Sequence, residues 1–448
     1  MVKFRLREEK LKQKWAGKND MVPVNAPQYV FVDEKKEEEF HHNMYPKKED
    51  REKYEMYRSE WYRRAKEFDA GDFPLSVNIE LVSTCNLACT MCYTITDKFQ
   101  NAIVGAQRMI PWKIVKNIID EAVEIGVYCI SFSWRGESTM YRSKDDSSGK
   151  IMTFPDVLKY ARDAGILEVN SLTHGQLIDE KMAEEIVLAE PSWISFSIDG
   201  MNEDYNKIRT PANKLNTEYN AFERVCKSIK LLNHYKIKHN LKRPQIRTNS
   251  VFPAIQKNPE EYRDFMLGIG VDFITVNEIV DYRHHRLRDE MVRENWACQF
   301  PFQRLTISAN GVMLPCTGCY NEEIGLVLGK YTGSEDKIVR DYKGKVASSK
   351  LDNKTLMEAW HCEKLKNIRN LHQDGLRKQI EPGCRNCHHG AQKHGADYVP
   401  KEWDVETQQW RKHDHLSDKR NYKKRGNNFL LKKTIDKKKN SISSDTKI

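Results

Sequence analysis

The stretch Cys85-Asn-Leu-Ala-Cys89-Thr-Met-Cys92-Tyr93 decides how this chain is organised. It places three cysteines in a C-x3-C-x2-C array directly after the apolar run 77–82, which is typical of a buried strand. Three thiolates at this spacing hold one face of an iron–sulfur cube and leave the fourth iron without a protein ligand. An open position marks a reactive metal centre, as it does for zinc. The array therefore predicts a reactive cluster at the end of the first strand.

Zinc and free thiols are the alternative interpretations of this array. A zinc site would require a fourth Cys or His close by in the same loop, and the sequence has none before Asp97. The unusual spacing and the position after a strand favour the cluster.

The array resembles the signature of the radical S-adenosylmethionine (radical SAM) superfamily. The resemblance implies that S-adenosylmethionine chelates the open iron of a [4Fe-4S] cluster through its amino and carboxylate groups. One electron, from a donor such as flavodoxin or ferredoxin, then cleaves the sulfonium and leaves a 5′-deoxyadenosyl radical, which takes a hydrogen atom from the substrate. The protein supplies position and excludes water.

The next two hundred residues alternate between strand and helix patterns, which predicts an α/β fold. Six strand–helix repeats favour a parallel sheet curled into a partial (β/α)6 TIM-like barrel, with reactive groups at the carboxyl ends of its strands. The predicted strands are 77–82, 128–134, 167–172, 193–198, 246–252 and 273–276, and the predicted helices are 112–125, 155–164, 179–189, 219–233 and 259–267.

Polar residues close the later strands. Gly136 and Glu137 offer a ligand amine exposed carbonyls, close approach and a carboxylate. They resemble the superfamily's Gly-Glu-Pro element, which contacts the methionine amino group, although Ser138 stands where proline is usual. The same resemblance implies that Ser197 binds the ribose or carboxylate of the cofactor and that Arg247 binds its carboxylate.

Two further residues are candidates by position. Tyr93 follows the third cysteine and is predicted to pack on the adenine, with core packing as the alternative. Asp199 lies just beyond the cofactor contacts and is a candidate catalytic residue that faces the substrate. Its Ser-Ile-Asp-Gly sequence is, taken alone, a turn after a strand.

Cysteines return where the strand–helix rhythm stops. Cys298 and Cys316 flank a predicted hairpin with Asn310-Gly311 at its turn, and Cys384 and Cys387 form a distant C-x2-C loop. Four thiolates in this layout bind one cluster or one zinc ion.

This layout resembles the SPASM domain, or its shorter twitch form, which follows the radical SAM core. The fuller form carries seven cysteines for two clusters, and nothing beyond Cys387 supplies the rest, so one auxiliary [4Fe-4S] cluster is predicted. The segment 355–360 matches the helix expected before the last cysteines. Cys319 is a candidate catalytic thiol that returns a hydrogen atom to the substrate radical, or an alternative ligand. The remaining cysteines, Cys129, Cys226 and Cys362, are predicted to be structural.

Four parts of the chain are predicted: a charged, mainly helical extension (1–74), the radical SAM core (75–290), a small cysteine-rich SPASM/twitch domain (291–400) and a basic, disordered tail (401–448). Within the extension, Tyr54, Tyr57, Trp61 and Tyr62 recur at near-helical spacing. They predict an amphipathic helix that packs on the body, with a recognition arm for a peptide or partner as the alternative.

The composition of the 448 residues limits the cellular compartments in which the protein is expected. No apolar run approaches the ~20 residues of a membrane span, and the first residues lack the apolar core of a signal peptide. The eleven cysteines are therefore expected in a reducing cytoplasm, as metal ligands rather than disulfides.

Residues 401–448 contribute 14 Lys/Arg and 7 Asp/Glu to the net charge of +10. No aromatic residues interleave with the lysines at 432–439, so a solvated tail is favoured over nucleic-acid binding.

The resemblance therefore implies an enzyme that removes one hydrogen atom from an unactivated carbon. Relatives with one auxiliary cluster act on sugars, aminocyclitols and ribosomally made peptides, and the extension does not resemble a leader-binding domain. The expected substrate is a carbohydrate or nucleotide-linked sugar that is oxidised or epimerised at carbon. One alternative is a maturase of a ribosomally made peptide or protein. Another is a non-catalytic zinc or iron–sulfur scaffold that binds RNA through its tail.

Overall fold

The structure is a computed structural model. It describes residues 3–6, 29–32, 39, 42–95, 109–212, 219–277, 297–320, 322, 325–334, 339–340, 346–348, 351–381, 383–385, 387, 403–404, 406–407 and 409–410. The tail predicted at 401–448 lies almost entirely outside these residues. Among the helices that they include, we find no stretch with the length and hydropathy that a lipid bilayer requires.

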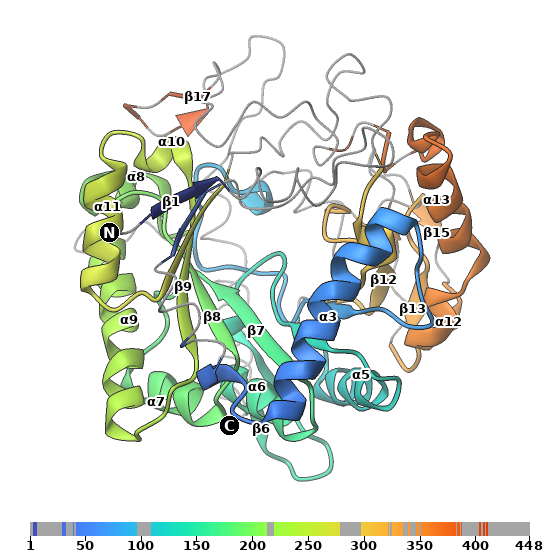
Figure 1. Ribbon diagram of the computed structural model, residues 1–448, viewed down its shortest axis with the longest axis horizontal. Coiled ribbons are helices and arrows are strands. Elements are labelled where there is room, and N and C mark those ends of the chain that lie inside the picture. The colour runs from blue at the N-terminus through green and yellow to red at the C-terminus, as the bar shows by residue number, and fades with distance from the viewer. Residues whose placement is uncertain are drawn as a thin grey trace, which may run out of the picture.

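A partial barrel of parallel strands forms the centre of the molecule (Figure 1). Among the described residues, six strands pair in parallel in the order in which they follow one another along the chain, and the main helices lie outside them. The predicted α/β fold class is confirmed. The strands are β3 (Ser76–Ile79), β4 (Cys129–Ser131), β7 (Glu168–Thr173), β8 (Trp193–Ser197), β9 (Gln245–Val251) and β10 (Phe273–Asn277), and the helices are α5 (Trp112–Glu124), α6 (Phe154–Asp163), α7 (Glu180–Ala189), α9 (Ala221–Lys238) and α11 (Pro259–Gly268).

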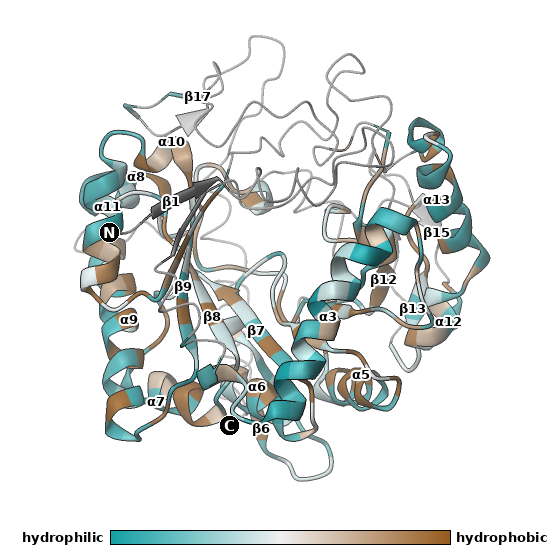
Figure 2. Cartoon of the chain, in the orientation of Figure 1, coloured by the Kyte–Doolittle hydropathy of each residue, from teal (hydrophilic) through white to brown (hydrophobic). Residues whose placement is uncertain are grey.

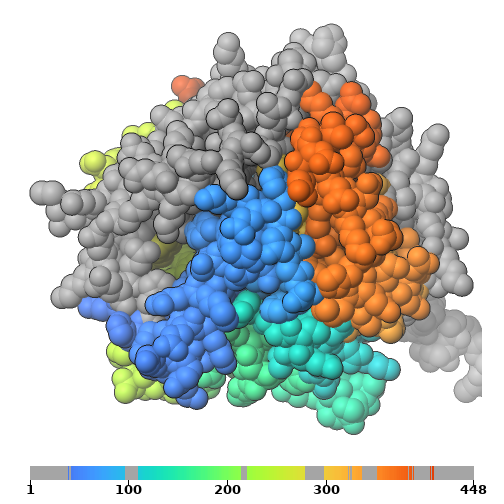
Figure 3. All heavy atoms as spheres, turned by 45° about the vertical axis from the view of Figure 1, so that its right-hand side comes forward, coloured from blue at the N-terminus to red at the C-terminus, as the bar shows by residue number. Residues whose placement is uncertain are grey.

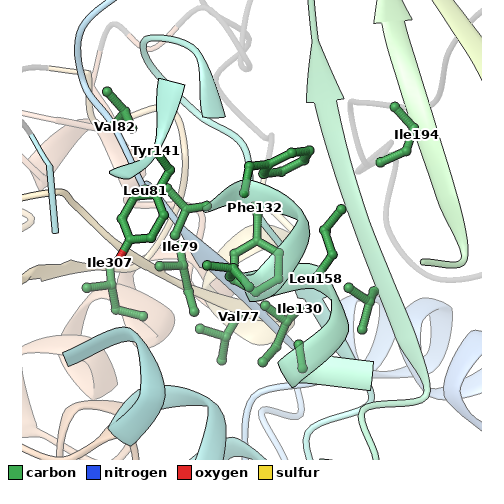
Figure 4. Packing of buried hydrophobic residues seen from close by; sticks show 14 of the residues in the cluster. Val77, Ile79, Leu81, Val82, Ile130, Phe132, Tyr141, Leu158, Ile194 and Ile307 are labelled. Carbon is green, nitrogen blue, oxygen red and sulfur yellow. The ribbon is translucent and has the colours of Figure 1, made fainter. Parts of the chain in front are cut away.

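Apolar side chains on one face of the sheet pack against the outer helices. Val77 and Ile79 of β3 and Ile130 of β4 are fully buried and belong to one cluster with Leu158 of α6 and Ile307 (Figure 4). The helices meet this face with their own apolar stripes, and the brown residues of α5 in Figure 2 belong to such a stripe. Burial of this interface supplies the main free energy that closes the sheet.

The opposite face of the same strands is polar. Side chains alternate along a strand, so the residues between those of the apolar cluster point into the barrel. Pairing places Ser197, Asn249 and Thr275 side by side on this inner face. The hydroxyl of Thr275 donates to the amide oxygen of Asn249 at 3.2 Å. Toward the carboxyl ends of these strands, the inner face therefore offers neutral hydrogen-bonding groups, whereas Arg247, Trp193 and Phe273 lie on the same face nearer the amino ends.

The amino-terminal region covers the barrel with helix α3 (Lys48–Glu67). Tyr57 is 2% exposed, and its ring stacks on that of Tyr128 at 5.3 Å. Figure 3 shows α3 against the orange C-terminal elements, where Phe68 meets Phe302 at 5.6 Å. The predicted amphipathic helix that packs on the body is confirmed.

Two strands in the same region were not predicted. β1 (Lys3–Leu6) and β2 (Tyr29–Val32) pair antiparallel, and β2 continues the sheet beside β10. Strands of four residues are too short for hydrophobic periodicity to distinguish them within a charged segment.

The C-terminal region continues the barrel sheet at its other edge. β11 (Arg304–Ile307) pairs in parallel with β3 and forms the predicted hairpin with β12 (Val312–Leu314). Gly311 has φ +78°, which the hairpin turn requires. β13 (Gly329–Tyr331), β16 (Asn353–Lys354), α12 (Leu356–Trp360) and α13 (Glu363–Gln373) follow.

Short elements complete the described chain: β5 (Arg142–Lys144), β6 (Ile151–Thr153), α8 (Asn202–Ile208), α10 (Phe252–Ile255), β14 (Val339–Arg340), β15 (Val346–Ser348), β17 (Trp403–Asp404), β18 (Gln409–Trp410), and the 3₁₀ turns at Tyr93–Ile95, Ser138–Met140, Phe300–Phe302 and Arg377–Gln379.

A capping box starts α12 and gives a first prediction. The Thr355 hydroxyl accepts from the amide of Glu358 at 3.2 Å, and the Glu358 carboxylate accepts from the amide of Thr355 at 2.8 Å. Thr355→Ala is expected to lower the free energy of unfolding by about 1 kcal/mol, because one helix-end amide loses its acceptor. Chemical denaturation under anaerobic conditions measures the change, with Thr355→Ser as the control that keeps the hydroxyl. Equal losses for both variants would contradict the capping role.

Candidate functional site

The three cysteines of the first array lie together in the loop that leaves β3. Cys85 is close enough to Cys89 and Cys92 that their charges raise the pKa of its thiol, in addition to the larger effect of burial. Burial raises the pKa of Cys89 to about 11. All eleven cysteines of the chain are free thiols. Cys89 is buried, and Cys85 and Cys92 are partly exposed. Three grouped thiols are the donor set that an iron–sulfur cluster takes, because bound metal replaces their protons.

A segment after β8 holds this loop in place. The amide of Ala88 donates to the carbonyl of Thr210 at 2.7 Å, and the Thr210 hydroxyl donates to the carbonyl of Ala88 at 2.8 Å. This pairing brings Arg209 to the array, with its Nη1 3.6 Å from the Sγ of Cys89. Arg209 could not be identified from the sequence, because only long-range pairing brings it to the cysteines.

Asp199 is the buried ion-pair partner of Arg209. Its Oδ2 accepts from Arg209 Nε at 2.8 Å and from Arg209 Nη2, and its Oδ1 accepts from the amide of Val251 at 3.0 Å. The side chain of Asp199 is 1% exposed. The carboxylate predicted to face the substrate thus lies against the guanidinium, and a catalytic role for it stays a prediction.

The Gly136-Glu137 loop packs directly on the end of β3. The amide of Glu137 donates to the carbonyl of Thr84 at 2.9 Å. Gly136 has φ +69°, and a Cβ at this position would lie 2.4 Å from the carbonyl oxygen of Val82. Only glycine permits this approach, so the loop and the residue before Cys85 are locked together.

The Glu137 carboxylate joins the ends of two strands. It accepts hydrogen bonds from Thr139 Oγ1 at 2.7 Å, from Thr173 Oγ1 at 2.6 Å and from the amide of His174 at 3.0 Å. Thr173 ends β7, and the loop of Glu137 follows β4. The carboxylate therefore fixes the strand ends beside the cysteine array.

Ser197 and Tyr93, which are also predicted to contact the cofactor, lie in different surroundings. Ser197 ends β8 on the inner face of the barrel and is 8% exposed. Tyr93 is 3% exposed, and its ring lies 5.4 Å from that of Tyr320, which agrees with the core-packing alternative.

The side chain of Arg247 lies away from the cysteine array. Its guanidinium lies 4.5 Å from the ring of Trp193 and 5.2 Å from that of Phe273, the first residues of β8 and β10, and its Nε donates to Gln245 at 2.6 Å. These contacts point toward the amino ends of the strands, away from the cysteines. The predicted contact with the cofactor carboxylate has no support in this geometry.

The second set of cysteines gathers in the C-terminal region. Burial raises the pKa of Cys384 well above its usual value, and the charges of Cys316, Cys387 and Cys298 add to this rise. Burial likewise raises the pKa of Cys298 to about 12. These effects indicate that the four thiols lie near one another, and their binding of one iron–sulfur cluster stays a prediction. Within the described part of the chain, no three His, Cys, Asp or Glu side chains are grouped as ligands of a single metal ion.

Basic side chains border this second set. Arg377 is fully buried and lies near Cys387, Cys384 and Cys298, and burial lowers its pKa. His372 accepts from the amide of Cys298 at 3.2 Å, and burial lowers its pKa to about 3, so that its ring is neutral. A buried positive charge beside four thiolates offsets part of the negative charge of a bound cluster.

The loop of Cys319 lies between the two sets of cysteines. Cys319 is 1% exposed. Trp134, which precedes the Gly136 loop, donates through Nε1 to the carbonyl of Thr317 at 2.7 Å, and the ring of Tyr320 lies 6.5 Å from that of Trp134. Since Tyr320 also meets Tyr93, the loop contacts both parts of the first site. The proposed hydrogen-atom donor Cys319 stays a prediction.

A buried cluster of charged side chains joins the end of β3 to the C-terminal region. Arg135 donates to Glu80 at 2.7 and 2.6 Å, to Glu322 at 2.8 Å and to the carbonyl of Tyr320 at 3.0 Å. All three charged side chains are at most 4% exposed. The carboxylates come from β3's carboxyl end and from the C-terminal region, so sequence periodicity gave no signal for this cluster.

Two parts of the chain match models of known protein families. Residues 79–244 match the Radical SAM superfamily, and residues 298–388 match SPASM, described as an iron–sulfur cluster-binding domain. The chain therefore contains a Radical SAM domain followed by a SPASM domain. The two domains imply S-adenosylmethionine and two [4Fe-4S] clusters as cofactors of this radical SAM protein.

Individual relatives are more distant. The radical SAM protein is 32% identical over 127 residues to an Fe-coproporphyrin III synthase from Methanosarcina barkeri and 25% identical over 165 residues to a cysteine-type anaerobic sulfatase-maturating enzyme from Clostridium novyi. These matches cover 28% and 36% of this chain and only 27% and 40% of the relatives. A solved structure, anSMEcpe with bound AdoMet, is similar over 82% of this chain and 96% of its own, with 13% identity and a TM-score of 0.46.

Proposed function

We propose that this radical SAM protein is an enzyme that cleaves S-adenosylmethionine reductively and abstracts a hydrogen atom from a carbohydrate or nucleotide-linked sugar. The observation that carries the proposal is the joining of the three grouped thiols to the Gly136-Glu137 loop at the carboxyl ends of adjacent parallel strands. Ligands of such barrels bind at this end.

The proposed roles follow from these contacts. Cys85, Cys89 and Cys92 would hold a cluster that, when loaded with S-adenosylmethionine, supplies the deoxyadenosyl radical. Gly136 lets its loop approach β3 and presents backbone groups to the methionine amine, while Glu137 keeps the loop rigid through Thr139, Thr173 and His174. Burial of Cys89 and Tyr93 limits the access of water to one side of the array, which would protect a radical from side reactions.

The inner face of the barrel supports a sugar as substrate. Ser197, Asn249, Thr275 and Asn277 line neighbouring strands, and each presents a neutral hydroxyl or amide. Such groups both donate and accept, which suits the hydroxyls of a sugar. Loss of a hydrogen atom from a carbinol carbon, followed by loss of one proton and of one electron to the auxiliary cluster held by Cys298, Cys316, Cys384 and Cys387, would give a ketone. Return of a hydrogen atom from Cys319 would give an epimer instead.

The proposal is tested with deuterated sugar nucleotides. Reduced, cluster-loaded protein is incubated with S-adenosylmethionine and a panel of sugar nucleotides that carry deuterium at each carbinol carbon. Deuterium in the 5′-deoxyadenosine, measured by mass spectrometry, is expected with one labelled position and identifies the carbon attacked. Deoxyadenosine that forms at the same slow rate with every sugar and without deuterium would contradict a carbohydrate substrate.

A peptide maturase is the second candidate. It is supported by the match to a sulfatase-maturating enzyme, whose name describes action on a protein. The same assay with deuterated cysteine- or serine-containing peptides in place of sugars distinguishes the two, because only the true substrate transfers deuterium.

A further inference from the structure

The three thiols of the first array differ in what contacts their sulfur atoms. The Sγ of Cys85 accepts from the amide of Leu87 at 3.3 Å, and the Sγ of Cys92 lies 3.0 Å from the hydroxyl of Thr94. Both of these groups are neutral. The Sγ of Cys89 instead accepts from Nη1 of Arg209 at 3.6 Å. Among the contacts that the described residues make with these sulfurs, this one alone carries a formal charge.

The guanidinium is fixed in this position from two sides. Asp199 binds the Nε and Nη2 edge, while Nη1 faces Cys89. The backbone amide of Arg209 donates to the carbonyl of Tyr205 at 2.8 Å, at the end of α8. The Arg209 side chain is 14% exposed. A planar group held at one edge points its other edge in a defined direction.

The charges of the pair do not cancel at the sulfur. The carboxylate of Asp199 lies on the far edge of the guanidinium, so the positive group is nearer to Cys89 than the negative one. In a buried site this difference is weakly screened. Hydrogen bonds to ligand sulfurs and local charge both tune the reduction potentials of iron–sulfur clusters.

We propose that Arg209 raises the reduction potential of the cluster held by Cys85, Cys89 and Cys92, and so determines how readily that cluster accepts the electron used to cleave S-adenosylmethionine. The inference rests on the proposed function of this site. Reduction adds one negative charge to the cluster, and a guanidinium at a ligand sulfur stabilises the more negative state. Arg209 is a positioning and tuning residue in this account, since it acts on the cofactor through a ligand.

The test is a redox titration of Arg209→Gln in the full chain with both clusters reconstituted. The EPR signal that changes on addition of S-adenosylmethionine reports the first cluster and separates it from the auxiliary one. Arg209→Gln is expected to lower the equilibrium constant for one-electron reduction about tenfold, which makes the potential about 59 mV more negative. Arg209→Lys keeps the charge and is expected to shift it less. Thr94→Val removes the neutral contact to Cys92 and serves as the matched control, with a shift smaller than that of Arg209→Gln.

The outcomes separate this inference from the proposed function. A negative shift confined to the first cluster supports the role of Arg209. An unchanged potential in Arg209→Gln overturns it. Should that variant lose its first cluster, a potential that shifts further in Arg209→Lys than in Thr94→Val overturns it, because lysine keeps the positive charge at Cys89. In both of those cases wild-type protein still cleaves S-adenosylmethionine. Wild-type protein with no cluster that responds to S-adenosylmethionine would overturn the proposed function and this inference together.

Discussion

Cys89→Ala is expected to abolish cleavage of S-adenosylmethionine while the second cluster remains. Removal of one of three thiolates leaves the first cluster with two protein ligands, and its neighbour Arg209 with no sulfur to contact. Cys298, Cys316, Cys384 and Cys387 lie in a separate region and are unaffected. Iron content should fall from about eight to about four per chain, and 5′-deoxyadenosine should fall below detection in a dithionite-driven assay.

The matched control for this prediction is Cys226→Ala. Cys226 lies on α9, is 8% exposed and belongs to the apolar core. Its loss is expected to reduce stability slightly, with full iron content and unchanged cleavage per folded molecule. Cleavage that persists in Cys89→Ala, or iron loss shared equally by both variants, would be incompatible with a cluster on the first array.

Arg135→Leu is expected to destabilise the protein by about 3–5 kcal/mol, the usual cost when a buried ion pair loses one partner. The guanidinium binds two carboxylates, Glu80 and Glu322, and all three side chains are buried. Without it, both carboxylates remain in a site of low polarity. Chemical denaturation measures the change. Arg162→Leu, which breaks the more exposed pair with Glu190, is the control and is expected to cost at most about 1 kcal/mol.

The loss in Arg135→Leu is also expected to depend on pH. Burial raises the pKa of Glu322 even in the presence of Arg135, and removal of the cation raises it further. A carboxyl group whose pKa is higher in the folded than in the unfolded protein stabilises the fold below its unfolded pKa, and this contribution is lost as pH rises through the folded pKa. The variant should therefore be least destabilised in acid. A destabilisation that is independent of pH would mean that leucine harms packing rather than charge balance.

Local sequence patterns were sufficient to predict most of the strands of the barrel. The predicted strands at 167–172 and 193–198 correspond to β7 and β8 within a residue, because short segments between two helical patterns leave few alternatives. The grouping of Cys85, Cys89 and Cys92 also follows from spacing alone, since they share one short loop. The hairpin at Asn310-Gly311 was predictable from its turn residues.

Contacts between distant segments could not be predicted in this way. Arg209 and Glu322 reach their partners only after loops from different strands come together in the fold. The periodicity of hydrophobic residues carries no information about which loops come together. The side-chain direction of Arg247 likewise could not be predicted, and its contact with the cofactor stays a prediction. Its place near a strand end suggested a cofactor contact, but the direction of its long side chain is determined by Trp193 and Phe273, which lie at the other end of the barrel.

The pairing of β11 with β3 has a consequence for how electrons move. The strand that leads to Cys85 and the strand that follows Cys298 are joined by backbone hydrogen bonds over four residue pairs. Along this path the described residues form one continuous sheet. Tunnelling between their centres would therefore occur across a constant gap, so its rate would depend on driving force rather than on hinge motion.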